Sequence, residues 1–243
     1  MNLIKTAVKS LLLTSLLASQ SLWAEAPLEE RDPWEGLNRK IFVFNETLDK
    51  YALKPVAEGY QWITPDPVED GVSNVFSNLW ELTTIANDLL QFKFGQAASD
   101  TGRFLVNSTV GLLGIFDVAS HMGLEKHQED FGQTLGHWGV ESGPYIVAPL
   151  FGPFTVRDGF GRIVDGVSTD VVGRIDDVPT RNQLYGTRVI NDRAGLIEAE
   201  KLITGDRYTF IRNAYLQRRD YLVNDGVVED DFGEDDFDDE WEE

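Results

Sequence analysis

The three histidines are the residues of this chain best suited to acid–base or metal chemistry, and their spacing fits neither. His121, His127 and His137 lie six and ten residues apart, which matches neither two ligands one helical turn apart nor a zinc signature. The sequence also contains no Walker loop, dinucleotide fingerprint or nucleophile elbow. We therefore predict no catalytic residue, no metal site and no cofactor, and expect a protein that is not an enzyme.

Arginines are the second group of residues that could bind a ligand. A guanidinium suits phosphate because its planar fork donates two hydrogen bonds at once. Ten arginines are spread through residues 157–219, namely Arg157, Arg162, Arg174, Arg181, Arg188, Arg193, Arg207, Arg212, Arg218 and Arg219. Most have an acid close by in the sequence, so ordinary surface ion pairs are the expected role of most of them.

The overall charge limits the class of partner. The chain carries a formal net charge of -20, and residues 225–243 contain 12 acidic residues and no basic one. A nucleic-acid partner is not expected, because neutralising phosphates requires a basic face. Residues 225–243 are predicted to form a disordered acidic tail, which either binds a basic partner or only adds solubility.

Helices are the elements that must position these side chains. Apolar residues recur at steps of three and four from Leu37 to Tyr51 and from Val68 to Leu90. A third stretch of helical spacing runs from Ala97 through Thr101, Phe104 and Leu105 to Ser108. Residues 157–223 are again helical in places, and no two-residue alternation is long enough to predict a sheet. The fold class is therefore mainly α.

Two uncharged segments interrupt the helical pattern. Residues 104–116 and 142–156 contain no charged residue, and both are too short and too broken by glycine and proline to span a membrane as helices. Between them, residues 129–143 form a glycine-rich stretch with Gly132, Gly136, Gly139 and Gly143. Two interpretations remain open at this point: a buried apolar core joined by glycine turns, or a surface that lies in a lipid interface and is edged by aromatic residues.

The N-terminus has the pattern of an export signal. Lys5 and Lys9 precede an apolar run from Leu11 to Ala18, and small residues end at Ala24. We predict a signal peptide over residues 1–24, a helical domain over 25–224 and the acidic tail from 225. The sequence has no cysteine, so neither a disulfide nor a cysteine-linked lipid anchor is expected.

Several motifs, in one order, resemble those of the VacJ/MlaA family. They are DPWEGLNRKIFVFN (Asp32 to Asn45), KPVAEGYQWITP (Lys54 to Pro65), GVSNVFSNLWE (Gly71 to Glu81), FLVNSTVGLLGIFDVAS (Phe104 to Ser120) and EDFGQTLGHWGVESGPYIVAPLFGPFTVRDG (Glu129 to Gly159). The resemblance extends more loosely to AYLQRRDYL and covers about Asp32 to Asn224. Many members of that family carry a lipidated cysteine at the end of the signal, which this chain lacks.

The resemblance implies a location and a function. Members of the family are helical proteins of the outer membrane, facing the periplasm, in which interfacial helices form a ring around a central polar channel. They take mislocalised phospholipid from the outer leaflet and pass it to a soluble periplasmic phospholipid carrier protein, beside a trimeric porin. For this chain the implied partners are thus phospholipid, the outer membrane, the porin and the carrier. The hold on the membrane would come from the folded helices.

Within that resemblance we assign candidate residues to three roles. The head-group or channel candidates are Arg157, Asp158, Arg162, Asp192 and Arg193. The hinge-loop candidates are Gly132, Gly136, Gly139 and Gly143. The membrane-facing candidates are Leu112, Leu113, Phe116, Tyr145, Phe151 and Phe154. The alternatives are a soluble periplasmic protein that binds lipid or another hydrophobe, a lipid hydrolase, and a porin-associated structural protein.

Overall fold

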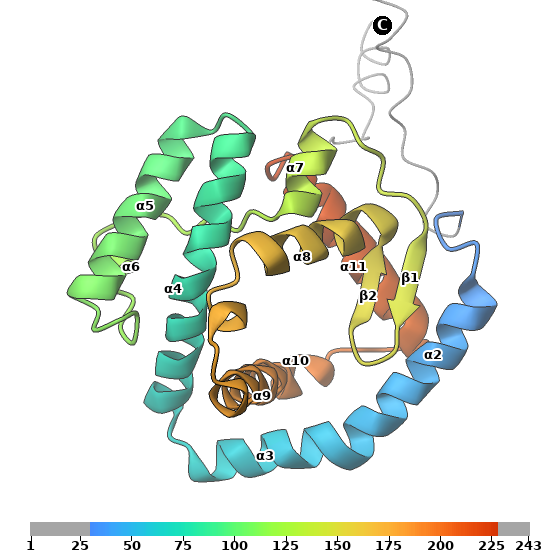
Figure 1. The fold of residues 1–243 in the computed structure, drawn as a ribbon. Coiled ribbons are helices and arrows are strands. Elements are labelled where there is room, and N and C mark those ends of the chain that lie inside the picture. The colour runs from blue at the N-terminus through green and yellow to red at the C-terminus, as the bar shows by residue number, and fades with distance from the viewer. Residues whose placement is uncertain (1–29, 228–243) are drawn as a thin grey trace, which may run out of the picture. The chain divides into compact units, whose positions relative to one another are not determined.

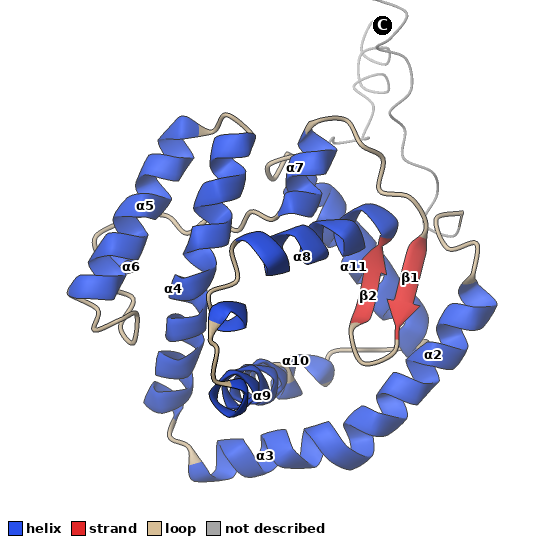
Figure 2. Ribbon diagram, viewed as in Figure 1, coloured by secondary structure: helices blue, strands red, loops and turns tan. Residues whose placement is uncertain are grey.

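The computed structural model describes residues 30–227, and its main compact unit begins at Asp32. Helices make up most of this unit, which confirms the mainly α prediction (Figure 2). The predicted signal peptide and residues 228–243 of the predicted tail lie outside the described residues. Residues 225–227 of the predicted tail are described, and Asp225 forms an ion pair with Lys93.

The first half of the unit consists of helices, with short connections up to α5 and longer ones before α6 and α7 (Figure 1). They are α2 (Glu35–Leu48), the π-helical stretch η2 (Asp49–Leu53), α3 (Lys54–Ile63), α4 (Asp66–Leu90), α5 (Phe94–Thr109), α6 (Val118–His121) and α7 (Phe131–His137). The three helical periods predicted from the sequence fall in α2 with η2, in α4 and in α5. Pro67 in the first turn of α4 fits its start, where a missing backbone N–H costs nothing.

The second half contains the following elements. They are β1 (Tyr145–Ala148), β2 (Gly152–Thr155), α8 (Val156–Ser168), η3 (Val172–Arg174), α9 (Val178–Gly195), α10 (Ile197–Glu200) and α11 (Arg207–Val223). Among the contacts that hold the unit together, α4 packs on α5 and α9, α3 packs on α9, and α7 packs on α8 and α11. Side chains cap three of these helices: Thr155 for α8, Asp177 for α9 and Asp206 for α11.

The two strands correct the prediction that the chain has no sheet. They pair antiparallel, with Tyr145 opposite Thr155 and Ala148 opposite Gly152. Each strand has four residues, which is too short for an alternation that sequence inspection can detect. Contacts distant in sequence support the hairpin: Asn38 donates to Tyr145 O at 3.0 Å and accepts from Val147 N at 3.0 Å. One heptad later, Asn45 binds the backbone of Ala148 and Leu150 in the same way.

Helices of this unit bury polar side chains and expose large apolar ones. The buried residues of α4 are Gly71, Asn78, Glu81, Thr83, Thr84, Asn87 and Asp88. In contrast, the apolar face predicted for residues 37–51 is largely exposed, with Tyr51 74 % exposed, and Trp62 in α3 is 87 % exposed. This is the reverse of the usual distribution in a water-soluble protein, where large apolar side chains fill the core. Among residues 30–227, no helix is both long enough and apolar enough to cross a bilayer.

Seven of the fifteen residues of the glycine-rich stretch form the helix α7, so two of the four hinge-loop candidates lie in a helix and not in a loop; a hinge role for the four glycines stays a prediction. Gly132 and Gly136 lie inside α7, where α7 meets α8 and α11. A Cβ on Gly132 would lie 2.7 Å from Asp158 Oδ1, and one on Gly136 would lie 2.7 Å from Val223 Cγ1. These two glycines therefore permit close packing. Gly139 and Gly143 have φ of +87° and +66°, so they serve turns that other residues adopt only with strain.

Candidate functional site

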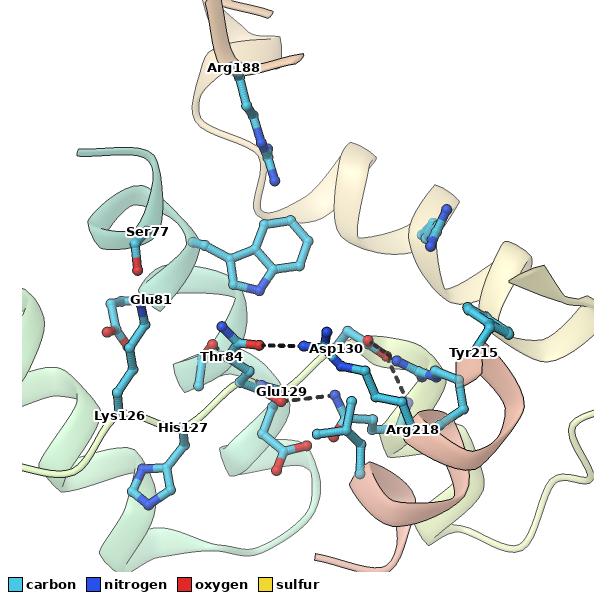
Figure 3. Close-up of a pocket in the computed structure, with 16 residues that line it drawn as sticks. Ser77, Glu81, Thr84, Lys126, His127, Glu129, Asp130, Arg188, Tyr215 and Arg218 are labelled. Carbon is cyan, nitrogen blue, oxygen red and sulfur yellow. Dashed lines mark hydrogen bonds and ion pairs between the residues drawn. The ribbon is translucent and has the colours of Figure 1, made fainter. Parts of the chain in front are cut away.

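A cavity of about 400 Å³ lies among α4, the segment before α7, α8, α9 and α11 (Figure 3). Its cationic lining residues are Lys126, Arg162, Arg188, Arg218 and Arg219, and its acidic lining residues are Glu81, Glu129 and Asp130. Figure 3 shows Arg188 reaching toward the cavity from α9, while Lys126 and Arg218 lie on opposite sides of it. These residues come from five separate parts of the chain, so only the fold brings them together.

Each acid of this cavity already binds a cation. Glu81 accepts from Arg103 Nε at 3.2 Å, and Glu129 contacts Lys93 Nζ at 3.0 Å. Asp130 accepts from Arg219 through both of its oxygens, at 2.6 and 2.9 Å. Two of these partners, Arg103 and Lys93, do not line the cavity. Two of the three acids, Glu81 and Glu129, are thus paired with cations that lie outside the cavity lining.

The Asp130–Arg219 pair is the most tightly held of the three. Burial disfavours the Asp130 carboxylate, but the hydrogen bonds and charge of Arg219 outweigh this and hold its pKa below the usual value. Asp130 also caps α7, where it accepts from Gln133 N at 2.9 Å. Arg219 contacts Asp158 as well, with Nε 3.0 Å from Oδ2. This arginine therefore joins α7, α8 and α11 and is committed to structure.

The four other cations of the cavity have little acidic compensation. Arg218 donates to the neutral Gln128 Oε1 at 3.3 Å, and Arg188 has one long contact of 3.7 Å with the exposed Asp192. Within the described part of the chain, Arg162 and Lys126 form no ion pair. The cavity is thus cationic although the chain as a whole is acidic.

Aromatic and apolar groups lie next to these cations. The Arg188 guanidinium carbon lies 5.5 Å from the centroid of the Trp80 ring, and that of Arg162 lies 6.0 Å from Phe154. Such contacts orient a guanidinium while leaving its N–H groups free to donate in the plane. Trp80 and Leu222 both line the cavity, so it offers an apolar wall beside the charges.

The predicted head-group residues are not brought together. Only Arg162 lines the cavity. Arg157 and Asp158 are buried, and Arg157 Nε donates to Asp158 Oδ1 at 3.1 Å. This buried contact makes both residues structural, because neither presents a free charge to a ligand.

The other predicted pair is also separated from the cavity. Arg193 binds Asp49 at 2.7 and 2.8 Å and Glu200 at 2.7 Å, which ties α9 to η2 and α10. These contacts raise the pKa of the Arg193 guanidinium, chiefly through Asp49. Asp192 lies on α9 with its side chain largely exposed and reaches the cavity only through Arg188.

Sequence inspection did not single out Trp80, Lys126, Arg188 or Arg218. Arg188 and Arg218 were among the ten arginines, but no local pattern distinguishes them from Arg193 or Arg219. The distinguishing property is the absence of a close buried acid, and that depends on contacts far apart in sequence. Arg219 and Asp130, for example, are separated by 89 residues.

Most of the predicted membrane-facing residues are exposed. Leu113 is 76 % and Phe151 is 77 % exposed, and Leu112 and Phe116 are also exposed. Phe154 is half-buried, and the Arg162 guanidinium lies over its ring. Tyr145 is a correction: it is fully buried in the hairpin and packs edge-on against Tyr208 and Tyr215. Burial raises the pKa of its hydroxyl. Tyr145 therefore belongs to the core, because alternate residues of this strand, Tyr145 and Val147, point inward.

The histidines remain apart from one another in the fold. His127 Nδ1 lies 3.0 Å from Asp100 Oδ1, and His121 Nδ1 contacts its own helix at Asp117 O. Across residues 30–227, no group of three or more His, Asp or Glu side chains is arranged to hold a metal ion.

An exposed apolar surface and a cationic cavity are the features expected of a protein that handles an amphiphile. Comparison with known proteins identifies the family: residues 30–222 match the model of the MlaA lipoprotein family. The chain belongs to this family.

Individual relatives agree with the family assignment. The chain is 35 % identical over 203 residues to the intermembrane phospholipid transport system lipoprotein MlaA of Escherichia coli K12, covering 81 % of this chain and 80 % of that one. A Rickettsia typhi protein is 44 % identical over 131 residues, and that match covers 54 % of this chain and about half (52 %) of the relative. A solved structure from a study of the maintenance of bacterial outer membrane lipid asymmetry aligns with a TM-score of 0.71 and 34 % identity, covering 79 % of this chain and 99 % of that one.

Proposed function

We propose that this chain is an outer-membrane phospholipid transfer protein that removes mislocalised phospholipid from the outer leaflet. The observation that carries the proposal is the reversed distribution of side chains, with amides, acids and arginines buried and large apolar groups exposed. An apolar exterior is stable where lipid replaces water. A polar interior offers a charged head group hydrogen-bonding partners that acyl chains cannot provide.

The exposed apolar residues account for membrane attachment. Leu112, Leu113 and Phe151 occupy two separate turns, and Leu113 and Leu150 have positive φ, so the backbone presents these side chains at the tips of loops. Burial of one large apolar side chain stabilises by about 1.5–3 kcal/mol. Several such residues together hold a protein in one leaflet without a spanning helix.

The finer parts of the proposal follow from the family. The helices encircle a polar route for head groups, the protein lies on the periplasmic side of the outer membrane beside a trimeric porin, and a soluble periplasmic carrier receives the lipid. The name of the Escherichia coli relative, which places it in an intermembrane phospholipid transport system, supports this assignment. The reaction requires no covalent chemistry. A soluble lipid-binding protein is the alternative, but such a protein would bury Leu113 and Phe151.

Loss of the gene tests the function directly. Cells that lack this protein should accumulate phospholipid in the outer leaflet, measured as phosphatidylethanolamine that reacts with a membrane-impermeant amine reagent. The double variant Leu113→Asp/Phe151→Asp should restore less than the unchanged protein and should shift to the soluble fraction. Gln217→Asp, an added charge at an exposed polar position of α11, is the matched control and should behave as the unchanged protein. Unchanged surface phospholipid in the deletion strain would overturn the proposal.

A further inference from the structure

The charge balance of the cavity is the starting observation. Five cationic side chains line it against three acidic ones, and Glu81, Glu129 and Asp130 are each paired with Arg103, Lys93 and Arg219 respectively. Any ligand in the cavity therefore meets an excess of positive charge. It also meets donors from three elements, because Arg162 lies on α8, Arg188 on α9 and Arg218 on α11.

A phosphodiester matches these donors. It carries one negative charge and two acceptor oxygens, which is the geometry that a guanidinium fork binds. Trp80 and Leu222 form an apolar wall suited to the carbon atoms that flank the phosphate. An ammonium group in the same cavity finds one acidic oxygen without a hydrogen-bond partner, Glu81 Oε2, but burial raises the pKa of that carboxyl. It also meets five cationic lining residues against three acidic ones.

Resting on the proposed function, we propose that this cavity binds the phosphate of a phospholipid head group and favours anionic lipids, such as phosphatidylglycerol, over zwitterionic phosphatidylethanolamine. Arg162, Arg188 and Arg218 bind the phosphate, and Lys126 adds positive charge at the entrance. Discrimination comes from the excess of cations over acids in the lining: the phosphate is common to both lipids, whereas only the zwitterion brings an amine into a cationic site.

The first test measures binding of water-soluble head groups by isothermal titration calorimetry at low salt. The full protein in a nonionic detergent is titrated with glycerophosphoglycerol, glycerophosphoethanolamine and inorganic phosphate. Glycerophosphoglycerol should bind about tenfold more tightly than glycerophosphoethanolamine. Arg162→Gln and Arg218→Gln should each weaken it about tenfold, the loss expected for one hydrogen bond to a charged group.

A matched control comes from the same helix as Arg188. Arg181 lies seven residues earlier on α9 and does not line the cavity, so Arg181→Gln should leave binding unchanged. Thermal unfolding of each variant verifies that it folds. Lys126→Gln, on an exposed segment between helices, is a second variant if an arginine variant unfolds, and it should reduce the preference for the anionic head group.

The second test separates a lipid from free phosphate. Lipids that copurify with the protein are identified by mass spectrometry and compared with a total membrane extract, and phosphatidylglycerol should be enriched in the unchanged protein and not in Arg162→Gln/Arg218→Gln. Equal binding of the two head groups would overturn the proposal. So would an equal loss in Arg181→Gln, or tight binding of inorganic phosphate without lipid enrichment.

Failure here is distinguishable from failure of the proposed function. If deletion of the gene raises surface phospholipid but the cavity variants bind and select lipids normally, the transport role stands and the cavity assignment is wrong. If deletion changes nothing while the cavity binds anionic head groups as described, the cavity assignment stands and the transport role is wrong.

Discussion

Two regions of this molecule differ in how the positive charge of their arginines is balanced by acids. Arg103 is 1 % exposed and every part of its guanidinium has a partner: Glu81, Asp117, Ser120 Oγ and the Leu124 carbonyl. Around the cavity, Arg162 and Arg218 are exposed and contact no acid. The same residue type therefore serves as a structural centre in one region and as a candidate ligand-binding group in the other.

The difference shows that the role of an arginine depends on whether a carboxylate lies close enough to pair with it. Asp117 binds Arg103 and also accepts from Ser120 and Asn107; these contacts overcome the effect of burial and hold its pKa well below the usual value. A carboxylate so stabilised keeps Arg103 charged and fixed. Asp130 is bound to Arg219 and Glu81 to Arg103, so Arg162 and Arg218 stay available to a ligand.

Replacing Arg103 tests this difference with the largest expected effect. Arg103→Leu leaves Glu81 and Asp117 without their cation in a buried setting, so we expect a loss of about 3–5 kcal/mol in the free energy of unfolding. Urea denaturation in detergent measures it. Arg218→Leu, at an exposed position, is the matched control and should change this free energy by less than about 0.5 kcal/mol. Equal losses in the two variants would show that pairing with acids does not determine how much an arginine contributes to the free energy of unfolding.

Close packing around Arg219 gives a second, smaller effect. Gly132→Ala would place a Cβ 2.7 Å from Asp158 Oδ1 and 2.9 Å from Arg219 Nη2, so we expect a loss of about 1–3 kcal/mol in the free energy of unfolding. Gly186→Ala in α9, where nothing lies within 4 Å, should instead be neutral or stabilising by up to about 1 kcal/mol. If both variants are neutral to urea denaturation, α7 is not held tightly and the hinge interpretation regains support.

A buried site with more acids than cations, at Asp88, predicts that the stability of the fold depends on pH. Asp88 is fully buried, and this burial, together with Asp100, raises its pKa to about 8. The folded state thus keeps a proton that the unfolded chain releases near pH 4, so stability falls as pH rises from 4 toward 8. We expect a loss of about 2–3 kcal/mol in the free energy of unfolding between pH 6 and pH 9, because each pH unit below the folded-state pKa costs about 1.4 kcal/mol.

Two variants isolate that effect. Asp88→Asn should flatten the pH dependence because the amide cannot ionise. Asp177→Asn should leave it intact, since Asp177 caps α9 at the surface with a lowered pKa and is ionised throughout this range in both states. A pH dependence that survives in Asp88→Asn would assign the titration to a group other than Asp88.

Local patterns predicted the helices well and the hairpin not at all. The three-and-four spacing from Leu37 to Tyr51 and from Val68 to Leu90 fixes amphipathic helices because one turn holds 3.6 residues. β1 and β2 have four residues each, and their support comes from Asn38 and Asn45, more than 100 residues earlier in the sequence. No local pattern carries that information.

The sequence by itself determined the helical class, the amphipathic faces and, through its motifs, the family. Only the tertiary structure decided which face of each helix points outward, because periodicity places residues on a common side without saying what covers it. It also decided that Arg157 is buried while Arg162 and Arg218 face a cavity. The physical reason is that the role of a charge depends on its nearest opposite charge, and for Arg219 and Asp130 that neighbour is 89 residues away.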